Sequence, residues 1–178
     1  MAQSLFITLK QRFPGCEIDV VSPEWSLPVL RRMPQVREGI ALPVVHGRLG
    51  MMTRYRLGCS LKSRNYSHAI VLPRSWKSAL VPYIAGVPIR TGYKGEMRYG
   101  LLNDIRVLDK TVLTQTVQRY VAHAYTESEV LNSPPQVPFP ELLAEKENTY
   151  NLLDRLELNL EKPVIGLIPG AEYGPAKQ

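Results

Sequence analysis

IVLPRSWKSALVPYIAGVPIRTGYKGEMRYGLLND, residues 70–104, is the stretch of this 178-residue chain that decides its fold. The stretch opens with an apolar run and breaks at Pro73, after which residues 76–85 have the pattern of a helix that ends at Gly86. Residues 87–91 then predict a second short strand. A strand, a helix and another strand in succession are typical of a parallel sheet with crossover helices.

The same alternation continues on both sides of this stretch. Residues 2–13 place Leu5, Leu9 and Phe13 on one face of a helix. Further helices are expected over residues 23–33, 49–64, 117–124 and 142–158, and further strands over residues 17–21, 36–42, 68–72 and 164–168. This order predicts an α/β fold with a Rossmann-like parallel sheet and helices on both of its faces.

Both ends of the chain are unusual for such a fold. The chain begins on a helix, whereas an open α/β domain normally begins on its central strand, and a new strand starts shortly before the end. We therefore expect a piece of a longer protein, whose first domain lacks its first strand. The expected division is a first domain over residues 1–132, a Pro-rich linker and connecting helix over 133–161, and the start of a second Rossmann-like domain over 162–178.

The positive charge of the chain is concentrated in its middle. The net charge is +6, and between Arg48 and Asn103 ten Lys or Arg residues face Glu96 alone. A basic middle indicates an anionic partner: a phosphorylated lipid, a membrane surface or a nucleic acid. The alternative is a solvated basic face with no partner.

Several classes of site are disfavoured by the composition. Cys16 and Cys59 form neither a disulfide framework nor a metal-binding spacing, which favours a reducing cytosolic compartment. The three histidines are far apart in the sequence, so no metal site is expected. No signal-peptide core and no apolar stretch of about 20 residues is present.

Two glycine-rich segments are candidate sites. GAEYGPAK, residues 170–177, follows the apolar run VIGLIP, so its backbone N–H groups and Lys177 could hold a phosphate; an ordinary strand-to-helix turn is the alternative. GYKGEMRYG, residues 92–100, interleaves aromatics with cations, as sugar and base sites do; the alternative is a packed loop with buried tyrosines. Glu96 in this loop is expected to orient Lys94 and Arg98 rather than to act as a base.

Three blocks of the sequence resemble the bacterial heptosyltransferases of glycosyltransferase family 9. They are SLFITLKQRFPGCEIDVVSPEW (residues 4–25), the block at residues 72–104, and VIGLIPGAEYGPAK (residues 164–177), and the resemblance covers the whole chain. It implies a GT-B architecture, in which two Rossmann-like domains face a cleft. It also implies an inverting, metal-independent transfer of L-glycero-D-manno-heptose from ADP-heptose to the heptose of the lipopolysaccharide inner core.

The resemblance further implies the partners and the location. The donor would be ADP-heptose, with no separate cofactor, and the acceptor would be the phosphorylated inner core. The protein would be cytoplasmic, in peripheral contact with the cytoplasmic face of the inner membrane, and would not bind nucleic acid. The rival hypothesis is a non-catalytic basic module for anionic lipid or nucleic acid, whose binding would fall steeply with salt. A third alternative is a remnant that does not fold, because loss of a central strand exposes two strand edges.

The site residues follow from the same resemblance. Lys177 matches the family's diphosphate-contacting lysine, and Tyr173 and Glu172 fall among its phosphate-contacting positions. The candidate acceptor-binding residues are Arg54, Lys62, Arg64, Arg74, Lys77, Arg90 and Arg98. The family's catalytic aspartate would precede Met1, so we expect no catalytic residue in this chain, and no activity from the chain alone.

Overall fold

The computed structural model describes residues 1–44, 49–158 and 164–166. The chain divides into two compact units, Met1–Leu143 and Ala144–Gln178. The domain boundaries expected from the sequence stay predictions. Residues 164–166 of the expected terminal strand have irregular backbone, and the rest of that strand lies outside the described residues.

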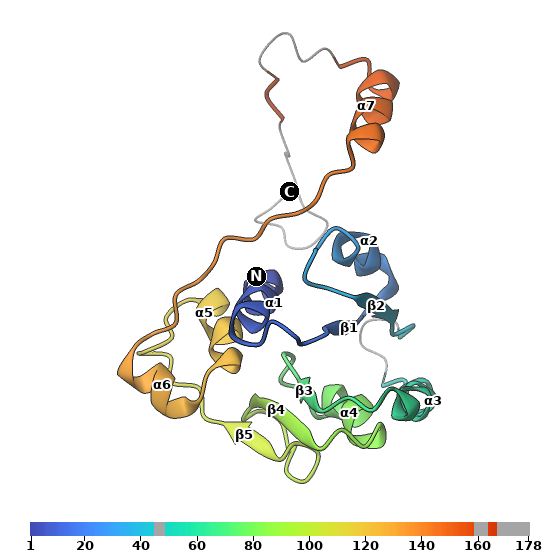
Figure 1. Ribbon diagram of the computed structural model, residues 1–178. Helices are drawn as coiled ribbons and strands as arrows, with labels where there is room; N and C mark the ends of the chain where they lie inside the picture. Colours follow the sequence, from blue (N-terminus) through green and yellow to red (C-terminus); the bar gives the residue numbers. More distant parts are fainter. Residues whose placement is uncertain (45–48, 159–163, 167–178) are drawn as a thin grey trace, which may run out of the picture. The chain divides into compact units, whose positions relative to one another are not determined.

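All strand pairs of the first unit are parallel, which confirms the predicted α/β class. The strands are β1 (Asp19–Ser22), β2 (Glu38–Ala41), β3 (His68–Ile70), β4 (Ile89–Tyr93) and β5 (Asp104–Arg106). They form a two-stranded sheet of β1 and β2 and a three-stranded sheet in the order β3-β4-β5 (Figure 1).

Short helices and 3-10 turns connect these strands. The first unit contains α1 (Ala2–Arg12), η1 (Glu24–Ser26), α2 (Leu27–Leu30), α3 (Met51–Leu61), η2 (Lys62–Arg64), η3 (Trp76–Ala79), α4 (Leu80–Ile84), α5 (Thr116–Val121), η4 (Ala122–Ala124) and α6 (Glu127–Asn132). The second unit contains α7 (Lys146–Arg155). Among the described residues, no helix is both long and apolar enough to span a bilayer.

Glycine and asparagine end helices where the sequence suggests. Gly86 has a φ of +73° directly after α4, and Asn65 has a φ of +50° after η2, a backbone region that both residues tolerate. The helix expected over residues 23–33 is shorter than predicted. Pro28 lies in the first turn of α2, where its missing N–H is harmless, and α2 is itself only four residues long.

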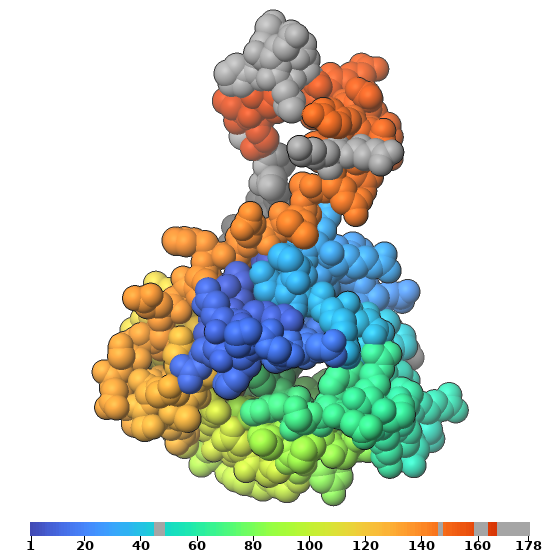
Figure 2. Space-filling model, in the orientation of Figure 1, coloured from blue at the N-terminus to red at the C-terminus, as the bar shows by residue number. Residues whose placement is uncertain are grey.

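The largest core cluster joins the two sheets through α1. Leu5 and Phe6 of α1 are buried together with Ile18, which precedes β1. Ile70 of β3 and Val20 of β1 both pack against this cluster. One helix therefore covers residues from both sheets, and its burial positions the sheets within the unit. The first residues of the chain, dark blue in Figure 2, reach the surface on the face shown there.

Helices α3 and α4 approach each other closely at Gly58. A Cβ atom at this position would lie 2.7 Å from the Cβ and Cγ2 atoms of Ile84 and 3.1 Å from the carbonyl oxygen of Val81. Carbon atoms in contact normally stay about 3.5–4.0 Å apart, so only glycine fits without displacement of one helix. The contact fixes the rotation of α3 and thereby decides which of its faces is exposed.

Candidate functional site

The loops that follow β3 and β4 form the candidate site, because ligands of open α/β folds bind outside the carboxyl ends of the strands. Residues 71–75 follow β3, and residues 94–103 follow β4. Of the predicted acceptor residues, Arg74 and Arg98 lie in these loops, and Lys77 lies in η3, which directly follows the first loop. We call this part of the surface the carboxyl edge.

Arg98 connects the two loops from the inside. Its side chain is buried, with the residue only 2% exposed, and its Nη1 atom donates to the carbonyl oxygen of Pro73 at 2.6 Å. Its Nη2 atom donates to the carbonyl oxygen of Tyr93. Burial lowers the pKa of the Arg98 guanidinium. These contacts fit an architectural role, and the predicted contact of Arg98 with the acceptor stays a prediction.

The two loops also pair through their backbones. The Glu96 N–H donates to the carbonyl oxygen of Arg74 at 3.2 Å, and Nη2 of Arg74 donates to the carbonyl oxygen of Lys94 at 2.9 Å. A Cβ atom on Gly95 would lie 2.4 Å from the Arg74 carbonyl oxygen, so the approach requires glycine. The pairing places the exposed cations Arg74 and Lys94 side by side at the carboxyl edge.

Glu96 has a different partner from the expected one. Its Oε2 atom accepts a hydrogen bond of 3.2 Å from the backbone N–H of Trp76, at the start of η3. Among the described residues it forms no ion pair with Lys94 or Arg98. The carboxylate therefore stabilises the first turn after β3 instead of orienting the flanking cations.

Two further arginines of the predicted group are also held by carbonyl oxygens. Arg54, in the first turn of α3, is buried and donates from Nε to the carbonyl oxygen of Leu49 at 2.9 Å, and burial lowers its pKa. Arg90, near the start of β4, donates from Nε to the carbonyl oxygen of Leu101 at 2.7 Å. The guanidinium of Arg90 also lies over the ring of Tyr83, 5.5 Å from its centroid.

Lys62 and Arg64 lie at the opposite edge of the sheets. Nη2 of Arg64 donates to Oε1 of Glu38 at 3.2 Å, and Glu38 is the first residue of β2. Arg64 itself directly precedes the loop into β3, so the amino ends of both sheets lie on the same side. The structure therefore does not bring Lys62 and Arg64 together with Arg74.

An ion-pair cluster that had no sequence signal lies at this amino edge. Asp19, the first residue of β1, accepts a hydrogen bond of 2.8 Å from Nε of Arg37 and another from the hydroxyl of Tyr66. The hydrogen bond from Arg37 holds the pKa of the Asp19 carboxyl below its ordinary value. The partners are 18 and 47 residues from Asp19, so only the folded chain brings them together.

A polar chain crosses the three-stranded sheet. Nε2 of His68 lies 2.7 Å from Oγ1 of the fully buried Thr91, whose hydroxyl donates to Oδ2 of Asp104 at 2.6 Å. Nη2 of Arg106 lies 3.0 Å from the same Asp104 oxygen. The chain links the side chains of β3, β4 and β5 within the sheet.

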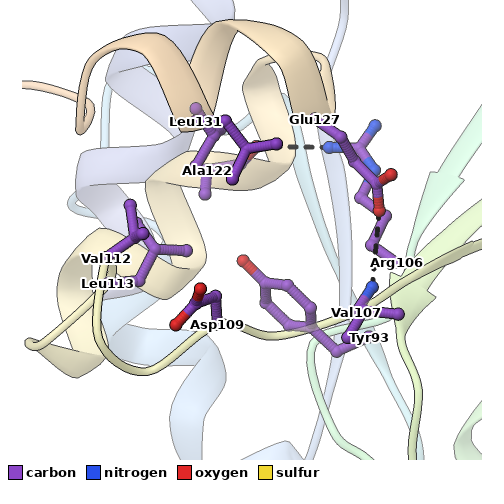
Figure 3. A pocket seen from close by; sticks show the side chains of 10 residues that line it. Tyr93, Arg106, Val107, Asp109, Val112, Leu113, Ala122, Glu127 and Leu131 are labelled. Atoms are coloured by element: carbon purple, nitrogen blue, oxygen red, sulfur yellow. Dashed lines mark hydrogen bonds between the residues drawn. The ribbon is translucent and has the colours of Figure 1, made fainter.

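A cavity of about 260 Å³ lies where β4 and β5 end (Figure 3). The hydroxyl of Tyr93 donates to the carbonyl oxygen of Arg119 at 2.9 Å, and burial raises the Tyr93 pKa to about 12. Arg106 donates from Nη1 to the carbonyl oxygen of Tyr125 at 2.6 Å. Most of the remaining lining is aliphatic: Val107, Val112, Leu113, Ala122, Val130 and Leu131.

The predicted donor-side residues cannot be placed, and no metal-binding group is found among the described residues. Glu172, Tyr173 and Lys177 lie outside the described residues, so their diphosphate contacts stay predictions. Within the part of the chain that the structure describes, no three His, Cys, Asp or Glu residues are grouped so that they could hold a metal ion.

The parallel sheets and their helices are those of a GT-B glycosyltransferase domain, which confirms the predicted fold. Residues 54–178 match the family model described as glycosyltransferase family 9 (heptosyltransferase). The chain therefore belongs to glycosyltransferase family 9.

Curated relatives and solved structures agree with this assignment. All of the chain is 48% identical to lipopolysaccharide heptosyltransferase 2 of Escherichia coli K12 and 45% identical to lipooligosaccharide heptosyltransferase 2 of Haemophilus influenzae. It spans 52% of each, about half the length of these relatives. The structure of E. coli ADP-heptose lps heptosyltransferase II matches 98% of the chain, with a TM-score of 0.83 and 43% identity, over 52% of its own length.

A second solved structure supports the fold alone. The glycosyl transferase family 9 protein from Veillonella parvula matches 97% of the chain and 50% of its own length, with a TM-score of 0.76 and 14% identity.

Proposed function

We propose that this chain belongs to an enzyme that transfers L-glycero-D-manno-heptose from ADP-heptose to the heptose of the lipopolysaccharide inner core. The observation that supports this most strongly is the 48% identity with lipopolysaccharide heptosyltransferase 2 over the entire chain. The unit Met1–Leu143 would bind the acceptor, and the transfer would take place at its carboxyl edge.

The exposed cations of the carboxyl edge are suited to a phosphorylated acceptor. Arg74 and Lys94 are exposed and adjacent, and Lys77 lies one turn further along in η3. Arg74 could form a bidentate pair with a phosphate group, whereas the lysines act as point charges. Tyr99 in the same loop is 66% exposed and offers a ring face to a sugar.

The other predicted acceptor residues would act differently. Arg54, Arg90 and Arg98 are held by backbone carbonyl oxygens, so their clearest contribution is to the shape of the loops and strand ends. Direct phosphate contact fits Arg74 and Lys77 best among the seven. Lys62 and Arg64, at the amino edge, are the least suited to it.

The donor contacts follow from the family resemblance alone. Lys177 would pair with the diphosphate of ADP-heptose, with Tyr173 and Glu172 beside it. A cation at that place would stabilise the charge that develops on the departing ADP. Since the acceptor sugar is anchored to lipid, the protein would work in the cytoplasm, in peripheral contact with the inner membrane.

A binding experiment on the purified chain tests the acceptor proposal. The ligand is the phosphorylated inner-core oligosaccharide, freed of lipid, and titration calorimetry measures its Kd. We expect Arg74→Gln and Lys94→Gln each to weaken binding by at least about tenfold, the lower end of the range for one hydrogen bond to a charged group. Arg31→Gln, an exposed charge in the turn after α2, is the matched control and should change the Kd less than twofold.

Ligand specificity distinguishes the heptosyltransferase proposal from the rival hypothesis of a basic module that binds any polyanion. Enzymatic removal of the phosphates should weaken binding, and DNA of equal charge should compete poorly. Equal affinity for DNA and oligosaccharide, with a steep salt dependence for both, would support the basic-module hypothesis instead. An unchanged Kd for Arg74→Gln would refute the placement of the acceptor at the carboxyl edge.

A further inference from the structure

The outer face of α3 is apolar although it is exposed. Met51 is 47%, Met52 61% and Tyr55 56% exposed. Met51 and Tyr55 are four residues apart and Met52 is adjacent, so the three side chains share one face of the first turns. Leu49, just before the helix, is 44% exposed. Exposed apolar side chains that are grouped in this way on a helix indicate a surface that contacts a membrane or another molecule.

The inner face of the same helix is already occupied. Arg54, Gly58 and Leu61 are buried, and the close contact between Gly58 and Ile84 holds α3 against α4. The helix therefore cannot rotate to bury its methionines in the unit. Figure 1 shows α3 on the outside of the sheet, next to α4.

The charges around the apolar face have one sign. Arg56 and Lys62 are exposed, and neither forms an ion pair with another residue of the described part of the chain. The sequence contains no acidic residue between Glu38 and Glu96. Exposed apolar residues beside unpaired cations can bind an anionic membrane, through apolar contact with the acyl boundary and attraction to the lipid phosphates.

We propose that α3 is the membrane contact of this protein and docks on an anionic bilayer surface. Met51, Met52 and Tyr55 enter the boundary between head groups and acyl chains, while Arg56 and Lys62 lie at the level of the lipid phosphates. Contact with a second copy of the chain is disfavoured, since it would bring these like charges together.

The position of α3 agrees with the proposed acceptor site. The helix begins after the carboxyl end of β2, as η3 begins after the carboxyl end of β3. Its apolar first turns therefore lie on the same side of the sheets as Arg74 and Lys94. The inference rests on the proposed function in one respect: a lipid-anchored acceptor is what makes a membrane contact at this edge useful.

Vesicle sedimentation tests the proposal. The purified chain is mixed with phosphatidylcholine vesicles with or without phosphatidylglycerol, and the bound fraction is measured against lipid concentration. The double variant Met51→Ser/Met52→Ser should weaken binding to anionic vesicles at least tenfold, because most of the inserted apolar surface is lost. Arg56→Gln should weaken it about fivefold, as expected for one cation near a charged surface.

Matched controls exclude non-specific effects. Phe139→Ser removes a side chain that is 92% exposed but far from α3 in the sequence, and Arg31→Gln removes an exposed charge. Both should bind vesicles within twofold of the parent chain. Relative to the parent chain, which already contains Trp25 and Trp76, Tyr55→Trp should add a blue shift and quenching by brominated lipid, which report insertion at this position. Far-UV circular dichroism should show that each variant is folded.

The possible outcomes separate this proposal from its rivals and from the proposed function. Unchanged vesicle binding by Met51→Ser/Met52→Ser, or equal binding to neutral and anionic vesicles, would overturn it. Self-association of the parent chain without vesicles, lost in the double variant, would show that a second copy covers the face. Loss of vesicle binding with an unchanged Kd for the lipid-free oligosaccharide supports it. If the parent chain does not bind the oligosaccharide but still binds anionic vesicles through α3, the proposed function is refuted and the membrane contact is not.

Discussion

His123 should make the stability of this chain sensitive to mild acid. The residue is 3% exposed, in η4, and its ring lies 4.4 Å from the ring of Tyr93. Neither ring nitrogen has a hydrogen-bond partner among the described residues. Burial, helped by the charge of Arg106, lowers the His123 pKa from its ordinary 6.5 to about 4. The folded chain thus holds a neutral imidazole that the unfolded chain protonates at pH 6.

The sign and size of the effect follow from this difference. A histidine whose pKa is lower in the folded state contributes stability above pH 6.5, and that contribution is lost as the pH falls toward 4. The full loss is about 3 kcal/mol, at about 1.4 kcal/mol per pKa unit. Between pH 7.5 and pH 5 the free energy of unfolding should fall by about 2 kcal/mol from this residue alone.

Urea unfolding at a series of pH values, followed by far-UV circular dichroism, measures this decline. His123→Phe keeps a ring against Tyr93 but cannot bind a proton, so its free energy of unfolding should lose most of the decline between pH 7.5 and pH 5. A smaller part should remain from His68, whose pKa is also lowered by burial. His68→Gln removes another imidazole, one that is hydrogen-bonded to Thr91, and should keep most of the decline. An equally steep decline in His123→Phe would refute the reasoning, as would a His123 NMR titration near pH 6.5.

Three further predictions concern the loops and helix contacts. Arg98→Met should lower the free energy of unfolding by about 2–3 kcal/mol, because the carbonyl oxygens of Pro73 and Tyr93 lose a charged donor; Lys94→Met, on the exposed part of the same loop, should change it little in the same urea assay. Gly58→Ala should cost about 1–3 kcal/mol through its clash with Ile84, and Ile84→Ala should relieve part of that cost in the double variant. Glu129→Gln should lower the Tm at pH 6, where the carboxylate caps α6, and the difference should vanish toward pH 2, since the backbone N–H of Thr126 holds the Glu129 pKa at about 2; a difference that persists at pH 2 would contradict this.

The fold was largely predictable because its strands and helices follow strong local signals. Alternating periodicities predicted the parallel class, and Gly86 marked the end of α4 as expected. The strand β5 was missed because three residues, Asp104–Arg106, have no periodicity to detect. The helix α6 was also missed, although Thr126 and Glu129 have the spacing of a capping box, which is a usable sequence signal.

The candidate site was less predictable, because net charge does not reveal where a cation lies. The sequence groups Arg64 with Arg74, yet the topology sends them to opposite edges of the sheets. It gives no indication that Arg98 is buried against two carbonyl oxygens. Such positions depend on contacts between loops that are distant in the chain. The glycines of residues 92–100, and Gly95 in particular, were the local sequence signal that this loop approaches the backbone at Arg74 closely.

The division of the strands into two short sheets also determines how the unit opens. Of the strands that the structure describes, β4 alone has a hydrogen-bonded neighbour on each side. Amide protons of Ile89–Tyr93 should therefore exchange most slowly with deuterium, and those of β1 and β2 much faster. Among the described strands, β1, β2, β3 and β5 each have one unpaired edge, and such an edge can also accept a strand from another molecule. Concentrated samples of this chain should consequently aggregate through these edges before the unit unfolds as a whole.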